Sequence, residues 1–229
     1  MTQYQGTELE LFAGAVRWKR YWRSRISDLV RGRVLDVGAG IGSTLELFRN
    51  ASSISQWTAL EPDESLAAMI RPASALSLQV ISGYLEDADG EYDTILYIDV
   101  LEHIADDQQE LQQAASRLAP GGKLIVLAPA HGWLYSDYDQ AIGHYRRYNR
   151  EMLTALSPAG ATLDRIEYLD LVGMLASLAN RWMLHQAAPG LRQVQTWDRL
   201  MVPVSRILDP LLGYRFGKSI LAIWSRPDN

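Results

Sequence analysis

The sequence predicts an α/β fold in which a doubly wound, mostly parallel sheet carries helices on both faces. Short, nearly all-apolar runs alternate with helical patterns along the chain, as expected for strands that are buried on both faces. The first of these runs ends in a glycine-rich turn that leads into a helix. The length of 229 residues suits one α/β domain, so we expect residues 1–229 to form a single domain.

Seven runs are predicted as strands, because each is short, largely apolar and bounded by turn residues. In chain order they are Arg33–Val37, Trp57–Leu60, Leu78–Ser82, Tyr92–Ile98, Lys123–Ala128, Thr162–Leu169 and Ser219–Ser225. Helices are expected over residues 9–30, 44–49, 64–70, 106–118 and 149–157. We expect Ser43 and Asp63 to cap the second and third of these helices, because short polar side chains can accept hydrogen bonds from the first turn.

A long segment at about residues 171–215 separates the last two predicted strands. It is apolar and rich in Trp, Leu and Met, and a structureless loop of this length would be unusual in a compact domain. We therefore predict an inserted helical cap. Apolar residues recur at helical spacing at Leu171, Met174, Leu175, Leu178, Trp182 and Met183. A surplus apolar face of the cap would bind an acyl or polyketide chain, lie on a membrane surface or pair with a second copy as a homodimer, and the sequence leaves these three roles open.

Composition and charge exclude several classes of protein. The formal net charge is −5, which disfavours duplex nucleic-acid binding, because such binding relies on neutralising phosphates. The chain has no cysteine, so disulfides, iron–sulfur clusters and thiolate zinc sites are excluded. The sequence shows neither a secretory signal nor a transmembrane stretch. We therefore expect a cytoplasmic protein that does not bind nucleic acid.

The turn after the first predicted strand reads Gly38-Ala39-Gly40-Ile41-Gly42. Glycines at a strand-to-helix turn let the backbone bend sharply and let a ligand lie against it. A dinucleotide-binding turn would place its third small residue one position later, where this chain has Ser43. NAD is therefore the second choice of ligand, and a tight turn without a ligand is the structural alternative.

Glu61 lies at the end of the second predicted strand, 23 residues after Gly38. At the carboxyl edge of a neighbouring strand, a carboxylate can accept hydrogen bonds from the two hydroxyls of a ribose. The alternative is a surface acid that precedes a helix. The spacing and the position at a strand end favour the ribose role.

Four segments together resemble the class I S-adenosylmethionine (SAM)-dependent methyltransferases, which have a Rossmann-like fold. These segments are Val34–Gly42, Leu60–Asp63, Tyr92–Ile104 and Leu118–Val126. Within the class, the chain resembles a small-molecule branch that carries a Val-Leu-Glu-His segment after the fourth strand, here residues 100–103. The run from Asp139 to Tyr148 resembles a bacterial subgroup of that branch, and this resemblance does not indicate a substrate.

The resemblance implies a seven-stranded sheet with an antiparallel last strand, and SAM as the cofactor. It also implies that the glycine turn lines the methionine end of SAM, that Glu61 holds the ribose and that Leu85 flanks the adenine. Tyr21 would reach the cofactor carboxylate from the N-terminal helix, or else pack within that amphipathic helix. The implied cofactor-binding residues are Tyr21, Asp36, Gly38, Ala39, Gly40, Glu61, Pro62, Leu85, Asp99 and Val100.

Two histidines are the candidate catalytic residues. Methyl transfer is an in-line displacement that needs a nucleophile about 3 Å from the methyl group and, for a hydroxyl or protonated amine, a base. His103 follows the fourth strand, and His144 lies in the loop after the fifth. The alternatives are packing or capping for His103 and a structural network with Asp139 and Arg147 for His144. Asp137, Asp139 and His144 lack a set spacing, so no metal site is predicted.

The predicted function is SAM-dependent methyl transfer to an oxygen or nitrogen of a small molecule, such as a natural product, a lipid or a sugar-linked metabolite. The segment Asp99-Val-Leu-Glu102 stands where similar amino-methyltransferases of nucleic acids and proteins carry a Pro-Pro motif. A nicotinamide-dependent oxidoreductase and a non-catalytic SAM-binding protein remain as alternatives. We also predict that the cap selects the acceptor and that SAM binding does not need the cap.

Overall fold

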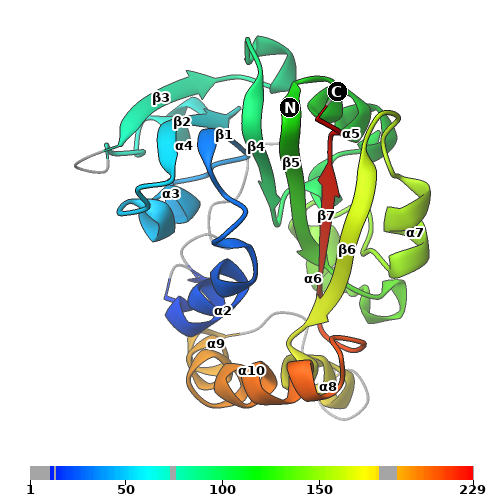
Figure 1. Cartoon of the computed structure of the whole chain (residues 1–229). Helices are drawn as coiled ribbons and strands as arrows, with labels where there is room; N and C mark the ends of the chain where they lie inside the picture. The colour runs from blue at the N-terminus through cyan, green and yellow to red at the C-terminus, as the bar shows by residue number, and fades with distance from the viewer. Residues whose placement is uncertain (1–10, 13, 73–75, 181–189, 229) are drawn as a thin grey trace.

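The computed structural model describes residues 11–12, 14–72, 76–180 and 190–228. Its centre is a seven-stranded sheet in the order β3-β2-β1-β4-β5-β7-β6 (Figure 1). The strands are β1 (Gly32–Val37), β2 (Ile54–Glu61), β3 (Ser77–Ser82), β4 (Tyr92–Ile98), β5 (Leu118–Pro129), β6 (Thr162–Leu169) and β7 (Ser219–Ser225). The pairs among β1 to β5 are parallel, and β7 runs antiparallel to both β5 and β6. The predicted fold class and the antiparallel last strand are therefore confirmed.

Helices and short turns of helix connect the strands. The α-helices are α2 (Val16–Ile26), α3 (Ser43–Phe48), α4 (Glu64–Ala67), α5 (Asp107–Ser116), α6 (Asp137–Ala141), α7 (Arg150–Ala155), α8 (Leu171–Ala179), α9 (Leu191–Thr196) and α10 (Val202–Leu211). The 3₁₀ turns are η1 (Leu85–Asp87), η2 (Leu101–His103) and η3 (Gly132–Leu134), and η5 (Trp197–Met201) is a π-helical turn between α9 and α10. Both faces of the sheet carry buried apolar side chains, which form two core clusters.

Two short helices, α3 and α4, were predicted to have side-chain caps at their N-termini. Asp63 caps α4 as predicted, and its side chain accepts hydrogen bonds from the backbone N–H groups of Ser65 and Leu66. The prediction for Ser43 is wrong, because Gly42 occupies the N-cap position of α3 with φ of +83° and no side chain caps the helix. The left-handed conformation of Gly42 lets the chain enter the helix one residue earlier than expected.

The segment predicted as a cap contains α8, α9, η5 and α10, which lie together with α2 at one end of the sheet (Figure 1). The predicted cap residues Trp182 and Met183 lie outside the described residues, as do residues 9 and 10 of the predicted N-terminal helix. No helix in the described part of the chain combines the length and the apolar character needed to cross a membrane.

The N-terminal helix is shorter than predicted and depends on the cap. α2 spans Val16–Ile26, and no side chain of its own caps its first turn. Asp198, in η5, accepts hydrogen bonds from the backbone N–H groups of Arg17 (3.2 Å) and Trp18 (2.8 Å) instead. The Tyr21 hydroxyl donates to Asp209 of α10 at 2.6 Å, and both side chains are buried. The helix therefore begins where the cap can satisfy its N–H groups.

The carboxyl ends of two strands carry unusual backbone. Asp99 follows β4 with φ of +55°, and Asp170 follows β6 with φ of +70°. Non-glycine residues rarely adopt this conformation, and where they do the site is often functional. The Asp170 carboxylate holds the start of α8 by accepting from Gly173 N at 3.0 Å, and it also accepts from the Trp197 indole N–H at 2.7 Å.

Candidate active site

The glycine turn lies between β1 and α3 and is as tight as its sequence predicts. Gly38, Gly40 and Gly42 all have positive φ, between +56° and +83°. A Cβ added to Gly38 would lie 2.6 and 2.8 Å from the two methyl carbons of Val100. Because Val100 follows β4, the turn and the end of β4 are in close contact, and a side chain at Gly38 would separate them.

Glu61 holds this turn from the end of β2. Its Oε2 accepts a hydrogen bond from Gly40 N at 2.7 Å, and its Oε1 accepts one from Asp63 N at 3.0 Å. Burial raises the pKa of Glu61, and the two backbone N–H groups offset part of that rise. A carboxylate has about four lone-pair positions. Each oxygen of Glu61 therefore retains acceptor capacity beyond its backbone bond.

One continuous cavity of about 1490 Å³ begins at this turn and extends to the cap. Ligand pockets in general have volumes of roughly 300–1,000 Å³, so this cavity has room for two ligands. Nine of the twelve predicted site residues line it, namely Gly38, Ala39, Gly40, Glu61, Pro62, Asp99, Val100, His103 and His144. The cap contributes residues of α8, α9 and η5, including Gly173, Gln193 and Trp197.

The other three predicted cofactor residues do not line the cavity. The hydroxyl of Tyr21 is directed to Asp209 in the cap. Asp36 is buried within β1, and burial raises its pKa to about 8. Leu85 is buried in the opposite core cluster and borders a separate small hollow. The hydrogen bond of Tyr21 and the burial of Asp36 and Leu85 keep these side chains away from the cavity.

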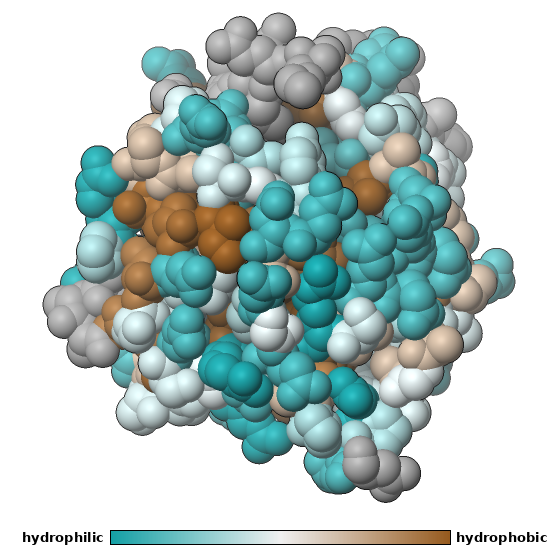
Figure 2. Space-filling view, turned by 90° about the horizontal axis from the view of Figure 1, so that it is seen from above, coloured by the Kyte–Doolittle hydropathy of each residue, from teal (hydrophilic) through white to brown (hydrophobic). Residues whose placement is uncertain are grey.

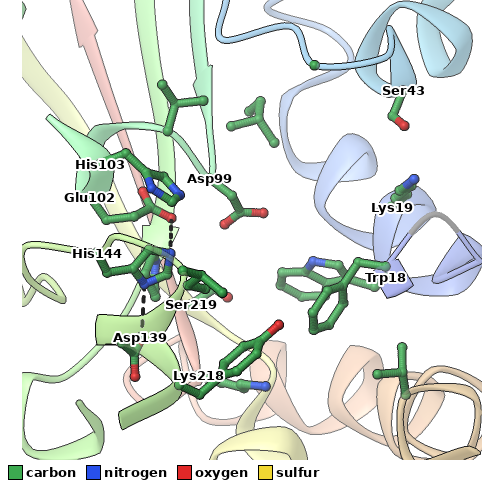
Figure 3. A pocket seen from close by; sticks show the side chains of 18 of the residues that line it. Trp18, Lys19, Ser43, Asp99, Glu102, His103, Asp139, His144, Lys218 and Ser219 are labelled. Carbon is green, nitrogen blue, oxygen red and sulfur yellow. Dashed lines mark hydrogen bonds and ion pairs between the residues drawn. The ribbon is translucent and has the colours of Figure 1, made fainter. Parts of the chain in front are cut away.

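Two histidines and two acids form one wall of the cavity (Figure 3). His144 Nδ1 lies 3.0 Å from Asp139 Oδ1, and His144 Nε2 lies 3.8 Å from Glu102 Oε1. The rings of His103 and His144 meet edge to face, with centroids 4.6 Å apart. Burial, together with the neighbouring His144, lowers the pKa of His103 to about 4. His103 is therefore neutral at neutral pH.

Arg147 fixes the orientation of Asp139. Its Nε and one terminal nitrogen donate to the two carboxylate oxygens of Asp139, at 2.8 and 2.9 Å. Burial favours the neutral acid, but the hydrogen bonds from His144, Arg147 and Ser136 hold the pKa of Asp139 below its ordinary value. Asp139 is thus an anion that can orient the His144 ring through Nδ1. Arg147 Nη1, the other terminal nitrogen, is buried and has no hydrogen-bond acceptor among the described residues.

Lys218 lies just before β7 and was not among the predicted site residues. Its side chain lines the cavity (Figure 3). Its Nζ lies 5.4 Å from the centre of the Trp197 ring. Burial lowers the pKa of Lys218, while Asp170 and more distant carboxylates oppose that effect. The signal that could have identified this lysine is its place ahead of the antiparallel strand, because such a strand starts at the carboxyl edge of its parallel neighbours.

Glu102, His103 and His144 could also hold a metal ion. One potential ligand atom of each lies within 4.8 Å of the others. A carboxylate and two imidazoles are suitable donors for Zn²⁺ and for other first-row divalent metals. Asp139 would then orient the ligating imidazole of His144. Sequence spacing predicted no such set, because Glu102 and His144 are brought together only by folding.

Comparisons with known proteins agree with this geometry. A family model described as a methyltransferase domain matches residues 16–172. The chain is 31% identical over 106 residues to a ubiquinone biosynthesis O-methyltransferase of Xanthomonas euvesicatoria, which covers 43% of this chain and 44% of that protein. It is 30% identical over 114 residues to an uncharacterised protein of Synechococcus, over 46% of this chain and 27% of that protein. The matches thus span less than half the length of these relatives.

Solved structures share the fold. A SAM-dependent methyltransferase of Archaeoglobus fulgidus superposes with a TM-score of 0.60 at 17% identity, over 97% of this chain and all of that one (100%). A phosphoethanolamine N-methyltransferase of Haemonchus contortus superposes with a TM-score of 0.62 at 15% identity, over 98% of this chain and 58% of that one. At these identities the likeness shows the fold.

Proposed function

The chain belongs to the methyltransferase-domain family whose model matches residues 16–172, and from this premise we propose that it transfers a methyl group from SAM to a hydroxyl oxygen of a small molecule. The observation that carries the proposal is the continuous cavity, which joins the glycine turn to the wall of His103 and His144. The similarity to ubiquinone biosynthesis O-methyltransferases supports oxygen as the methylated atom, with nitrogen as the alternative.

The residues at the glycine turn fit SAM. Glu61 is buried and holds the turn, yet its oxygens retain lone pairs that can accept from ribose hydroxyls. The absence of a side chain at Gly38 keeps the turn tight enough for a ligand to approach the backbone. When bound, SAM supplies a methyl group on a positively charged sulfur. Gly38–Gly40, Pro62, Asp99 and Val100 line the cavity and belong to the proposed cofactor site.

The acceptor would lie against the histidine wall. In the tautomer in which His144 Nδ1 donates to Asp139, His144 Nε2 carries a lone pair and can take a proton from an acceptor hydroxyl. Loss of that proton makes the oxygen a better nucleophile for the displacement. We therefore propose His144 as the general base, Asp139 as its positioning residue, and His103 as a second contact to the acceptor. Lys218 and Arg147 Nη1 offer donors to other polar groups of the acceptor.

One sequence feature would favour the alternative of a nicotinamide-dependent oxidoreductase. Tyr214 and Lys218 have the Tyr-x-x-x-Lys spacing of a dehydrogenase-like pair. Only Lys218 lines the cavity, because the ring of Tyr214 packs under the guanidinium of Arg25, 4.3 Å from its centroid. The two side chains therefore do not form one catalytic pair, and the oxidoreductase reading is not supported.

Turnover against a panel of acceptors tests the proposal. The purified chain is incubated with SAM and with phenolic, catecholic and aliphatic hydroxyl compounds, and S-adenosylhomocysteine is quantified by mass spectrometry. The general base contributes about 100-fold or more to the rate, so His144→Gln should lower kcat by that factor on any accepted compound and leave the affinity for S-adenosylhomocysteine within twofold. His131→Gln, a matched change outside the cavity wall, should retain turnover. Equal turnover of His144→Gln and the wild type would remove His144 as the base. SAM binding without turnover of any acceptor would favour the non-catalytic alternative.

A further inference from the structure

The helix formed by η5 and α10 has its apolar side outside and its acidic side inside. The residues that face the protein are Asp198, Val202, Ser205 and Asp209, all of which are buried. The residues that face outward follow helical spacing, and they are Leu200, Val204, Ile207 and Leu211, with exposed fractions of 66%, 45%, 65% and 75%. We call these four residues the outer cap face. A surface helix normally shows the reverse arrangement.

Hydrogen bonds fix this orientation of the helix. Asp198 accepts from the first turn of α2, and Asp209 accepts from the Tyr21 hydroxyl and from the backbone N–H groups of Asp170 (2.7 Å) and Leu171 (3.1 Å). Rotating the helix to bury its leucines would leave these acids and donors without partners, which is costly in a low-dielectric interior. The outer cap face is therefore held outward, and large exposed apolar patches of this kind usually mark interaction sites.

Positive charge lies on the same helix as the outer cap face and on the segments next to it. Between residues 190 and 217 the only acids are Asp198 and Asp209, and both are buried. The same segment carries four exposed arginines: Arg199 and Arg206 lie on this helix, Arg215 follows it, and Arg192 of α9 also lines the cavity. The whole chain has a net charge of −5, so this segment, with four arginines and two acids, is more cationic than the chain as a whole. The face opposite the cap, seen in Figure 2, is mainly hydrophilic and also carries apolar side chains.

We propose that the outer cap face, together with Arg199 and Arg206 on the same helix, binds the surface of a membrane that contains anionic lipids. Leucine, isoleucine and valine side chains would enter the boundary between headgroups and acyl chains, while the arginines pair with lipid phosphates. Charge disfavours a second copy as the partner, because a two-fold interface would bring the arginines of one copy against the same arginines of the other. This inference does not depend on the proposed methyl transfer.

Binding of the outer cap face to a membrane would place the cavity near the bilayer surface. Gly173, Ala176 and Ser177 of α8 line the cavity from the cap side. Trp197 and Met201 of η5 also line the cavity, and Leu200 of the same turn is exposed on the outer cap face. One layer of helix, about 10 Å thick, would therefore separate the cavity from the bilayer surface. Docking would bring the cap side of the cavity close to compounds dissolved in the membrane.

Vesicle co-sedimentation of the full chain tests the proposal. Sucrose-loaded vesicles of phosphatidylcholine alone are compared with vesicles in which about 30% of the lipid is anionic phosphatidylglycerol. We expect the wild type to bind the anionic vesicles at least tenfold more tightly than the neutral ones, and to release them as salt is raised to about 0.5 M. The double variant Ile207→Gln with Leu211→Gln should lose at least tenfold in binding, and Arg199→Gln with Arg206→Gln should lose the preference for anionic lipid.

Met69→Gln is the matched control, because Met69 is 54% exposed but lies in the turn after α4, outside the cap. It should bind vesicles like the wild type. Thermal melting of each variant shows that it is folded. Failure of the wild type to bind anionic vesicles would overturn the proposal, as would equal binding by the wild type and the Ile207/Leu211 variant. A dimer in sedimentation velocity that this variant dissociates, without vesicle binding by the wild type, would instead identify a second copy as the occupant.

Discussion

Glu61→Gln is the substitution that most directly separates the cofactor role of Glu61 from its structural role. In the native chain the two carboxylate oxygens accept from Gly40 N at 2.7 Å and from Asp63 N at 3.0 Å. Glutamine has nearly the same shape but only one acceptor oxygen, so one of these bonds is lost. A hydrogen bond to a charged group is worth about 1.5–3 kcal/mol. Burial already penalises the charge of Glu61, so we expect a loss of stability near the lower end, about 1.5 kcal/mol.

The same substitution should act more strongly on the cofactor. Loss of one charge-assisted bond to a ribose hydroxyl weakens binding by about 1.5–3 kcal/mol, which corresponds to a 10- to 150-fold higher Kd for S-adenosylhomocysteine. Calorimetric titration gives the Kd, and melting in the absence of ligand gives the stability, with a fall of about 3–6 °C expected for a domain of this size. Glu64→Gln, an exposed neighbour in α4, is the control and should change neither quantity. A Kd for Glu61→Gln within twofold of the wild type would refute the assignment of Glu61 to the cofactor site.

Three further predictions follow from other contacts. Gly38→Ala should raise the Kd for S-adenosylhomocysteine at least tenfold, because φ is +65° and a Cβ would meet a valine methyl carbon at 2.6 Å; Gly160→Ala, at φ of +80° with open space around it, is the titration control. Tyr21→Phe should lower the unfolding free energy by about 1–3 kcal/mol in urea titration, because Asp209 loses a buried donor, and an unchanged midpoint would contradict this. Asp139 has a pKa below its ordinary value, so its contribution to stability is complete above about pH 4 and declines as the pH falls further. Asp139→Asn should therefore be less stable than the wild type at pH 7 and should lose less stability on acidification, as measured by melting at several pH values. An equal loss of stability in both proteins as the pH falls would contradict this role of Asp139.

The part of the cavity that we propose for the cofactor could be predicted from the sequence because its geometry is local. The turn Gly38–Gly42 follows a strand directly, and Glu61 ends the strand that pairs with it. Parallel pairing of neighbouring strands then brings both to the same edge of the sheet. The positions of Asp99 and Val100 follow from the same rule, since β4 pairs with β1 on its other side.

The remaining features depend on contacts between distant parts of the chain. Tyr21 was expected to reach the cofactor, but its partner is Asp209, 188 residues away. Asp198 caps α2 from 180 residues away, and neither periodicity nor local spacing contains that information. These contacts also change how the role of the cap must be tested. Deleting residues 172–212 would remove both acids that hold α2, so point substitutions in the cap are needed to separate acceptor choice from SAM binding.

The central claim is that the glycine turn and Glu61 form a SAM site. It is tested most directly by calorimetric titration of the purified chain with SAM, S-adenosylhomocysteine and NADH in parallel. We expect saturable binding of SAM and S-adenosylhomocysteine with no binding of NADH. Binding of NADH alone would contradict it and would make the turn Gly38–Gly42 a dinucleotide site.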